Sequence, residues 1–397
     1  MESLSEPSAN TFVVHDTRIF DGAQITECDS VLVVDGRIAA LGQISAPHGI
    51  PVHDGRGTTL LPGLIDAHVH TSEEGRRDAL RFGVTIELDM FNDPEPLPEA
   101  RRRRQSLDRT DQADLWSAGI GVTVAGGHPN VPGWEYPRLT PDADPDQFVA
   151  DRIQAGSDYL KFILDDGGTP PLPTLTPEQV RAVIAAAHRR RRITIGHVEV
   201  LRHARTVVDA GTDGLAHVFV DTAPDEAFVA AIQQRGAFVV ATLSVFDCGV
   251  GADELLIDSR VRPYLSVDQI GALQSRRPGC QSSMLEIGRA NVGRLYAAGV
   301  PILAGTDAGL PGTADGVSMY AELTHLVRAG LTAQQALAAA TAVPAPPLRP
   351  HRSRPHRPGA ARRPAAGQRR PDPRYRGGPR HRRDLEKRLP SRPHTAP

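Results

Sequence analysis

The residues most able to do chemistry begin with His68 and His70, two histidines at the end of the apolar run from Leu61 to Val69. A Pro-Gly turn lies within the start of this run, which is typical of a buried strand. Side chains at positions i and i+2 of a strand point to the same side, so both imidazoles would face one place. Neutral imidazole is a common metal ligand, and the pair favours a divalent metal site over two ordinary polar residues at a strand exit.

A single lysine, Lys161, occurs before the C-terminal region, and the only other lysine of the chain is Lys387. Lys161 lies in the apolar segment 159–164, where an unpaired ammonium group would be costly. The alternative is a lysine that reaches solvent or pairs with Asp165 or Asp166. Because arginine fills nearly all other cationic positions, the sequence favours a functional role for Lys161.

Three more residues with metal-ligand side chains each end an apolar run: His197, His217 and Asp307. Alone, each histidine would more often be a hydrogen-bonded core residue, and Asp307 would more often be a helix N-cap. Together with the two histidines and the lysine above, they make six candidates at the ends of predicted strands. This coincidence predicts one shared site.

An alternation of strands and helices would position these six residues. We expect strands at 61–70, 84–90, 114–125, 159–164, 193–198, 214–219, 238–243 and 301–306, and helices at 76–82, 95–110, 145–156, 177–191, 199–210, 224–235, 286–298 and 317–329. Such alternation predicts an α/β fold with a parallel sheet. Eight units over about 270 residues fit a (β/α)8 TIM barrel, in which catalytic groups lie at the C-terminal ends of strands.

Two long loops are expected on the catalytic side. Residues 244–285 follow the seventh strand, and an insertion of this length is typical of a lid or a substrate-facing segment. Residues 126–141 place His128 just past the third strand. We predict that His128 binds substrate, and a turn histidine is the alternative.

Residues 1–60 contain short segments that look like strands and predict a small β domain, in which Asp35-Gly36 is a hairpin turn signal.

No apolar run approaches the roughly 20 residues that span a membrane, and no segment has the pattern of a signal peptide, so we expect a cytoplasmic protein. The three cysteines, Cys28, Cys248 and Cys280, are too few and too scattered to predict a disulfide framework or a zinc knuckle.

The motifs LPGLIDAHVH, YLKF, IGHV, GLAH and AGTDAG, in this order, resemble the amidohydrolase superfamily, and in particular its imidazolonepropionase-related, prolidase-like branch of metal-dependent hydrolases. The resemblance covers residues 10–343. It implies two divalent metal ions, with zinc favoured and manganese or cobalt also suitable for nitrogen and oxygen ligands. The implied metal ligands are His68, His70 and Asp307 for the first ion, His197 and His217 for the second, and Lys161, carboxylated by carbon dioxide, as the bridge between them.

The resemblance also implies a mechanism, in which a metal-bound hydroxide attacks the carbonyl group and Asp307 passes a proton to the leaving nitrogen. Burial of Lys161 favours the neutral amine that carboxylation requires. We therefore expect a metal-dependent amidohydrolase that cleaves an amide C–N bond of an N-acyl amino acid, a dipeptide or a cyclic amide. The expected partner is a small-molecule substrate, and we expect no nucleic acid or membrane partner. The sequence leaves the oligomeric state open, and a homo-oligomer is one alternative.

Two other functions remain open from the sequence. One is a mononuclear deaminase or an imidazolonepropionase-like ring hydrolase, in which Lys161 is unmodified and Glu199 is a general acid. The other is a non-catalytic, degenerate protein. The metal content per chain separates the first alternative from a two-metal hydrolase.

Residues 344–397 depart from the family pattern. They contain 15 Arg, one Lys and three acidic residues, a net charge of +13, so that residues 1–343 carry −15 of the total of −2. This stretch contains no Val, Ile or Phe and is expected to be a disordered Arg/Pro-rich tail. Related proteins end in strands that complete the small β domain. The predicted division is therefore an incomplete β domain (1–60), a barrel (61–343) and a basic tail, for which a reading-frame shift is one hypothesis.

Overall fold

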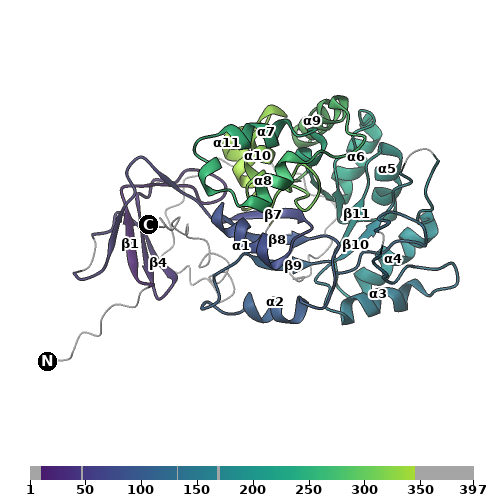
Figure 1. The fold of residues 1–397 in the computed structure, drawn as a ribbon, viewed down its shortest axis with the longest axis horizontal. Coiled ribbons are helices and arrows are strands. Elements are labelled where there is room, and N and C mark those ends of the chain that lie inside the picture. The colour runs from purple at the N-terminus through teal and green to yellow at the C-terminus, as the bar shows by residue number, and fades with distance from the viewer. Residues whose placement is uncertain (1–9, 46–47, 132, 168–169, 345–397) are drawn as a thin grey trace, which may run out of the picture.

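A computed structural model of the chain describes residues 10–45, 48–131, 133–167 and 170–344. Apart from Pro344, the predicted tail lies outside these residues. Figure 1 shows a small β lobe, formed by the N-terminal part of the chain, beside a larger body in which helices surround strands.

The strands of the larger body form two parallel sheets. One sheet has the order β7-β8-β9, and the other has the order β10-β11-β12-β13-β14. The strands are β7 (Leu64–Val69), β8 (Val84–Asp89), β9 (Asp114–Ser117), β10 (Leu160–Ile163), β11 (Thr194–His197), β12 (Gly214–Ala216), β13 (Phe238–Val240) and β14 (Ile302–Leu303). Parallel neighbours that follow chain order confirm the α/β class predicted from the alternating pattern.

Backbone hydrogen bonds join the two sheets at both boundaries. At one boundary, Val122 N donates to Lys161 O over 2.8 Å. At the other, Ala67 N donates to Ala304 O over 2.9 Å, and Val69 forms a parallel bridge with Ala308. The ends of β7, β10 and β14 are therefore held at fixed positions relative to one another.

Helices follow most of these strands. They are α1 (Glu73–Arg81), α2 (Leu97–Arg103), α3 (Pro145–Gln154), α4 (Pro177–Arg189), α5 (Leu201–Ala210), α6 (Glu226–Arg235), α7 (Val250–Ile257), α8 (Val267–Gln274), α9 (Ser282–Ala297), α10 (Ser318–Arg328) and α11 (Ala333–Ala339). Local sequence explains several starts: Thr176 forms a capping box with Gln179 at α4, and Asp144 caps α3 before a proline.

Several predicted boundaries are wrong. The strand expected at 114–125 ends at Ser117, because Gly119 adopts a positive φ of 59° and breaks the extended chain, which pairs again only at Val122. The helix expected at 95–110 ends at Arg103. The insertion 244–285 contains two helices, α7 and α8, and the following helix begins at Ser282 instead of 286.

Two clusters of apolar side chains form much of the core of the larger body. One cluster joins residues of many strands, among them Ile65, Leu88, Tyr159, Val240 and Leu303, and each is almost fully buried. A larger cluster joins strands to helices. Strands with apolar side chains on both faces are typical of parallel sheets covered by helices, and this explains why they read as continuous apolar runs.

The small lobe contains a four-stranded sheet with the order β4-β3-β1-β5 and a two-stranded sheet of β2 and β6. Its strands are β1 (Phe12–His15), β2 (Arg18–Ile19), β3 (Ser30–Val34), β4 (Arg37–Gly42), β5 (Val52–Asp54) and β6 (Thr59–Leu60). Asp35 and Gly36 have φ values of 50° and 73° and join β3 to β4, which confirms the predicted hairpin turn.

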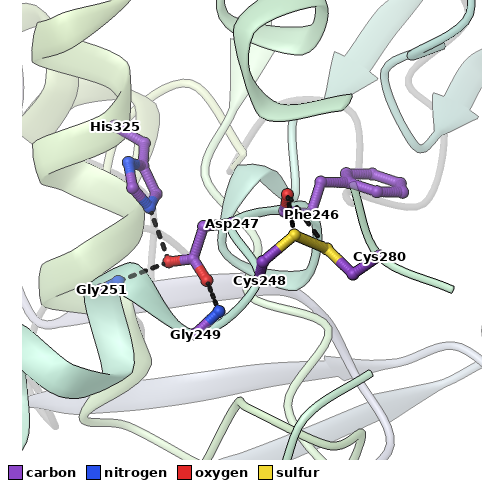
Figure 2. The surroundings of a disulfide bond; sticks show 7 residues. All are labelled: Phe246, Asp247, Cys248, Gly249, Gly251, Cys280 and His325. Carbon is purple, nitrogen blue, oxygen red and sulfur yellow. Dashed lines mark hydrogen bonds and ion pairs between the residues drawn. A yellow bond between two sulfur atoms is a disulfide. The ribbon is translucent and has the colours of Figure 1, made fainter. Parts of the chain in front are cut away.

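A disulfide joins Cys248 and Cys280 (Figure 2), a single pairing that the scattered cysteines of the sequence did not predict. The two residues are 32 positions apart in the chain, but the insertion folds back and brings their Cα atoms to 5.6 Å. Cys28 is free.

Within the described residues, we find no helix with the length and apolar character of a membrane span.

Candidate metal centre

His68, His70 and Asp307 form the first part of the candidate site. His68 lies in the last two residues of β7, His70 directly follows this strand, and Asp307 follows β14. His68 Nε2 lies 3.2 Å and His70 Nε2 lies 3.3 Å from Asp307 Oδ1. A backbone hydrogen bond of 2.8 Å from Asp307 N to His68 O fixes this approach.

Lys161 lies in the same cluster. It belongs to β10, its side chain is almost completely buried, and its Nζ is 3.2 Å from His68 Nε2. Burial lowers the pKa of Lys161 from 10.5 to about 8, although Asp307 and Asp89 oppose this shift. A larger share of this amine is therefore neutral near pH 8 than in an exposed lysine.

His197 and His217 form the second part of the site. His197 ends β11 and His217 follows β12, and the distance from His197 Nδ1 to His217 Nε2 is 3.2 Å. The hydroxyl of Thr242 lies 2.6 Å from His217 Nδ1 and fixes the orientation of this ring. His217 Nε2 is 3.9 Å from Asp307 Oδ2, so both parts meet at this carboxylate.

The charge states of these side chains suit metal binding. Burial lowers the pKa of His68 and His217 well below 6.5, so both imidazoles are neutral at pH 7. Burial alone would raise the pKa of Asp307, but His68, His217 and His70 outweigh it and hold this pKa well below its usual value. Neutral imidazoles and an ionised carboxylate are the forms in which these groups bind metals.

The residues present fit divalent metal ions. Buried Asp307 Oδ1 has no hydrogen-bond partner among the described residues, although two histidine nitrogens lie near it. The ligand atoms of His68, His70 and Asp307 all lie within 4.8 Å of one another. Nitrogen and carboxylate oxygen atoms gathered in this way are a typical zinc ligand set.

His128, the predicted substrate-binding residue, lies beside the cluster. Its ring stacks on that of His197 with 4.9 Å between centroids, and its Nδ1 is 3.7 Å from Asp165 Oδ2. Its side chain is 42% exposed, more than those of the buried histidines. This geometry places His128 between the cluster and solvent.

Sequence reasoning missed three contributors to the site: Asp165, Thr242 and Arg277. Asp165 Oδ2 lies 3.7 Å from His197 Nε2, and its position two residues after β10 was an available signal. Arg277 donates from Nη2 to Glu199 Oε1 over 2.8 Å. Glu199, the candidate general acid of the deaminase alternative, is therefore held by a guanidinium group.

Comparison with known proteins identifies the family. Residues 59–348 match the Amidohydrolase family, so the chain belongs to this family of hydrolases of carbon–nitrogen bonds. A mitochondrial allantoinase of Aquarana catesbeiana is 24% identical over 241 residues, which are 57% of this chain and 46% of the allantoinase. The chain thus spans less than half of that relative. An uncharacterized protein of Mycobacterium tuberculosis is 27% identical over 334 residues, 78% of each chain.

Solved structures share the fold. A crystal structure of a Xaa-Pro dipeptidase with methionine bound in its active site superposes with a TM-score of 0.65 at 21% identity, and the match covers 85% of this chain and 88% of the dipeptidase. At this identity, the similarity supports the architecture alone.

Proposed function

We propose that this protein is a metal-dependent hydrolase that cleaves an amide C–N bond in an N-acyl amino acid, a dipeptide or a cyclic amide. The observation that carries the proposal is the convergence of six ligand-type side chains from five strands and the residues that follow them. We propose further that the eight strands form one closed (β/α)8 TIM barrel. The hydrogen bonds that cross both sheet boundaries support the barrel.

Five residues and a bridging lysine would hold two divalent metal ions, for which zinc is favoured. His68 and His70 with Asp307 would hold one ion, and His197 and His217 would hold the other. When bound, such ions polarise a carbonyl group and lower the pKa of water toward neutrality. Lys161 would serve as a carboxylated bridge, because its buried amine has a lowered pKa and lies 3.2 Å from His68 Nε2.

The protein's own side chains would complete the reaction. Asp307 is ionised and buried, and its carboxylate would accept a proton and deliver it to the leaving nitrogen. The hydrogen bond of Thr242 would keep the His217 ring in place, since outer hydrogen-bond partners orient metal-binding imidazoles. The carboxylate of Asp165, 3.7 Å from His197 Nε2, would attract the His197 ring by its charge. His128 would contact the substrate from the more exposed side of the cluster.

The names of the similar proteins support hydrolysis of an amide bond but do not indicate one substrate. The names of the relatives include an allantoinase and dihydroorotases, and the similar structures include a Xaa-Pro dipeptidase. We therefore keep cyclic amides and dipeptides together as substrate classes. The expected partner is a small molecule, without nucleic acid or membrane partners, and a cytoplasmic location remains our expectation.

Metal content and activity test this function together. The protein is reconstituted with zinc, manganese or cobalt and screened against N-acyl amino acids, dipeptides and cyclic amides, with Asp307→Asn as the matched inactive variant. We expect two metal ions per chain and a loss of kcat of about 10²- to 10⁴-fold in the variant. One ion per chain would favour the mononuclear alternative. A folded, metal-loaded protein that is inert toward the whole panel would favour a non-catalytic protein.

A further inference from the structure

Arg277 is a cationic side chain near the candidate metal centre that the reaction above does not use. It lies in the turn between α8 and α9, inside the insertion 244–285. Its Cζ is 4.9 Å from the centre of the Phe246 ring, and this ring meets the His217 ring edge-on with 5.8 Å between centroids. The insertion therefore places a guanidinium group one aromatic ring away from a candidate metal ligand.

The hydrogen bonds of Arg277 are incomplete. Its Nη2 donates to Glu199, two residues after His197. Its Nη1 is buried and has no hydrogen-bond partner in the part of the chain that the structure describes. A buried donor of a charged group without an acceptor is costly, and a carboxylate is the acceptor that suits a guanidinium group best.

Arg277 also lies close enough to the centre for its charge to act there. Its guanidinium group lies over the ring of Phe246, and this ring contacts that of His217. An anionic group of a substrate bound at the metal centre would therefore lie in the field of this guanidinium.

The turn that carries Arg277 is held in place. Cys280, three residues later, is bonded to Cys248, which is two residues after Phe246. Figure 2 shows the disulfide beside Phe246, and Asp247 accepts hydrogen bonds from Gly249 N and Gly251 N on the same segment. A side chain fixed before binding loses less freedom when it engages a ligand.

From these contacts we propose that Arg277 binds the carboxylate of the substrate, and that the substrate is an N-acyl amino acid or dipeptide with a free carboxylate next to the scissile amide. This inference rests on the proposed amide hydrolysis and selects among its substrate classes. Neutral cyclic amides, which offer Arg277 no carboxylate, are poor substrates on this account.

Paired substrates test the proposal on the metal-loaded, full-length protein. N-acyl amino acids and dipeptides are compared with the same compounds carrying a C-terminal primary amide. We expect the wild type to prefer the acids, and Arg277→Gln to lower kcat/KM for the acids on the order of 100-fold while leaving the amides unchanged. Arg277→Lys, which keeps the charge but not the two-pronged geometry, should retain part of the preference.

Matched variants separate recognition from structure. Arg260→Gln removes an exposed arginine of the same insertion that pairs with Asp258, and it should leave both substrate series unchanged. Glu199→Gln removes the partner of Arg277 and should keep the acid preference. If Arg277→Gln lowers activity on acids and amides equally, or on neither, Arg277 does not bind the carboxylate although the proposed hydrolysis stands.

Calorimetry gives a readout that does not depend on turnover. Free amino acids and their amides are titrated into each metal-loaded variant, with thermal unfolding as a check that the variants are folded. Binding of the acids that weakens at least tenfold in Arg277→Gln supports the carboxylate site. Equal binding by wild type and Arg277→Gln overturns it, whereas failure of every variant to hydrolyse any amide defeats the proposed function itself.

Discussion

Asp307 combines a chemical role with an unusual backbone conformation. Its φ is 57°, a left-handed value that is rare for residues other than glycine, and its side chain is almost fully buried. Such conformations persist where the surrounding structure enforces them, often at functional sites. Here the enforcing contacts are the hydrogen bond from Asp307 N to His68 O and the close approach of Gly309 to His70.

Gly309 should be essential to this arrangement. Its φ is 98°, and a Cβ atom at this position would collide with the carbonyl oxygen of His70. We expect Gly309→Ala to destabilise the protein by about 1–3 kcal/mol and to reduce metal content, because His70 must move. Thermal unfolding and metal analysis measure both effects.

Gly271→Ala is the matched control for Gly309→Ala. Gly271 lies in α8, and a Cβ atom there would have no neighbour within 4 Å. Alanine favours a helix over glycine, so this change should leave metal content unchanged and stability equal or higher. An equal loss of metal in both variants would contradict the role assigned to Gly309.

We expect Glu322 to make the folding stability of the protein depend on pH. This buried carboxyl group accepts hydrogen bonds from Ser244 N and Oγ, yet burial raises its pKa from 4.5 to about 8. The folded state therefore binds the proton more tightly than the unfolded state, and stability falls as pH rises from about 4.5 toward 8. Glu322→Gln, which carries no charge, should flatten this dependence and raise stability at pH 8 by about 1–3 kcal/mol.

Thermal unfolding of wild type and Glu322→Gln between pH 5 and pH 8 checks this prediction. The two proteins should differ least at the acid end, where Glu322 keeps its proton in the folded state and part of the unfolded population is also protonated. A difference that grows toward low pH would show that the sign is wrong.

At the scale of elements, the insertion 244–285 is stabilised by more than packing. The disulfide closes it, and buried His325 of α10 contacts Asp247 at 2.9 Å beside the disulfide (Figure 2). Disulfides persist mainly in oxidising compartments, so an intact bond in the protein isolated from cells would count against the expected cytoplasmic location. The redox state of the purified protein bears directly on that question.

Removal of the disulfide should destabilise the insertion. We expect Cys248→Ser to lower the free energy of unfolding by about 2–4 kcal/mol, because the bond closes a loop between residues 32 positions apart. Treatment of the wild type with a thiol reductant should have the same effect. Cys28→Ser, which removes the free cysteine, is the control, and an equal change in that variant would exclude the disulfide as the cause.

At the scale of the whole molecule, the small β lobe exposes apolar side chains on its edge strands. Leu41 of β4 is 54% exposed and Val52 of β5 is 51% exposed, and these two strands are the edges of the four-stranded sheet within the described residues. Open edges with apolar side chains favour pairing between molecules.

Charged residues on these edges should therefore reduce self-association. We expect Leu41→Lys and Val52→Lys to lower concentration-dependent light scattering without a change in metal content, because charges on an edge strand oppose pairing. Ile257→Lys alters an apolar residue that is 83% exposed on α7, away from these edges, and serves as control. If this control lowers scattering as much, general hydrophobicity and not the sheet edge is responsible.

The sequence by itself determined the α/β class, the order of the strands and the identity of the six candidate ligands. This was possible because each buried parallel strand appears in the sequence as a short apolar run that is followed by polar residues. A pattern of this kind can be recognised within a few neighbouring residues. The His-X-His spacing and the isolated Lys161 needed no knowledge of distant residues.

Only the tertiary structure decided the contacts between distant segments. The pairing of Cys248 with Cys280, the contact of Thr242 with His217 and the approach of Arg277 to Glu199 each depend on how loops fold back over strand ends. Likewise, the early end of β9 depends on the conformation of Gly119. Such contacts join residues that are far apart along the chain, and no local pattern of residue types encodes them.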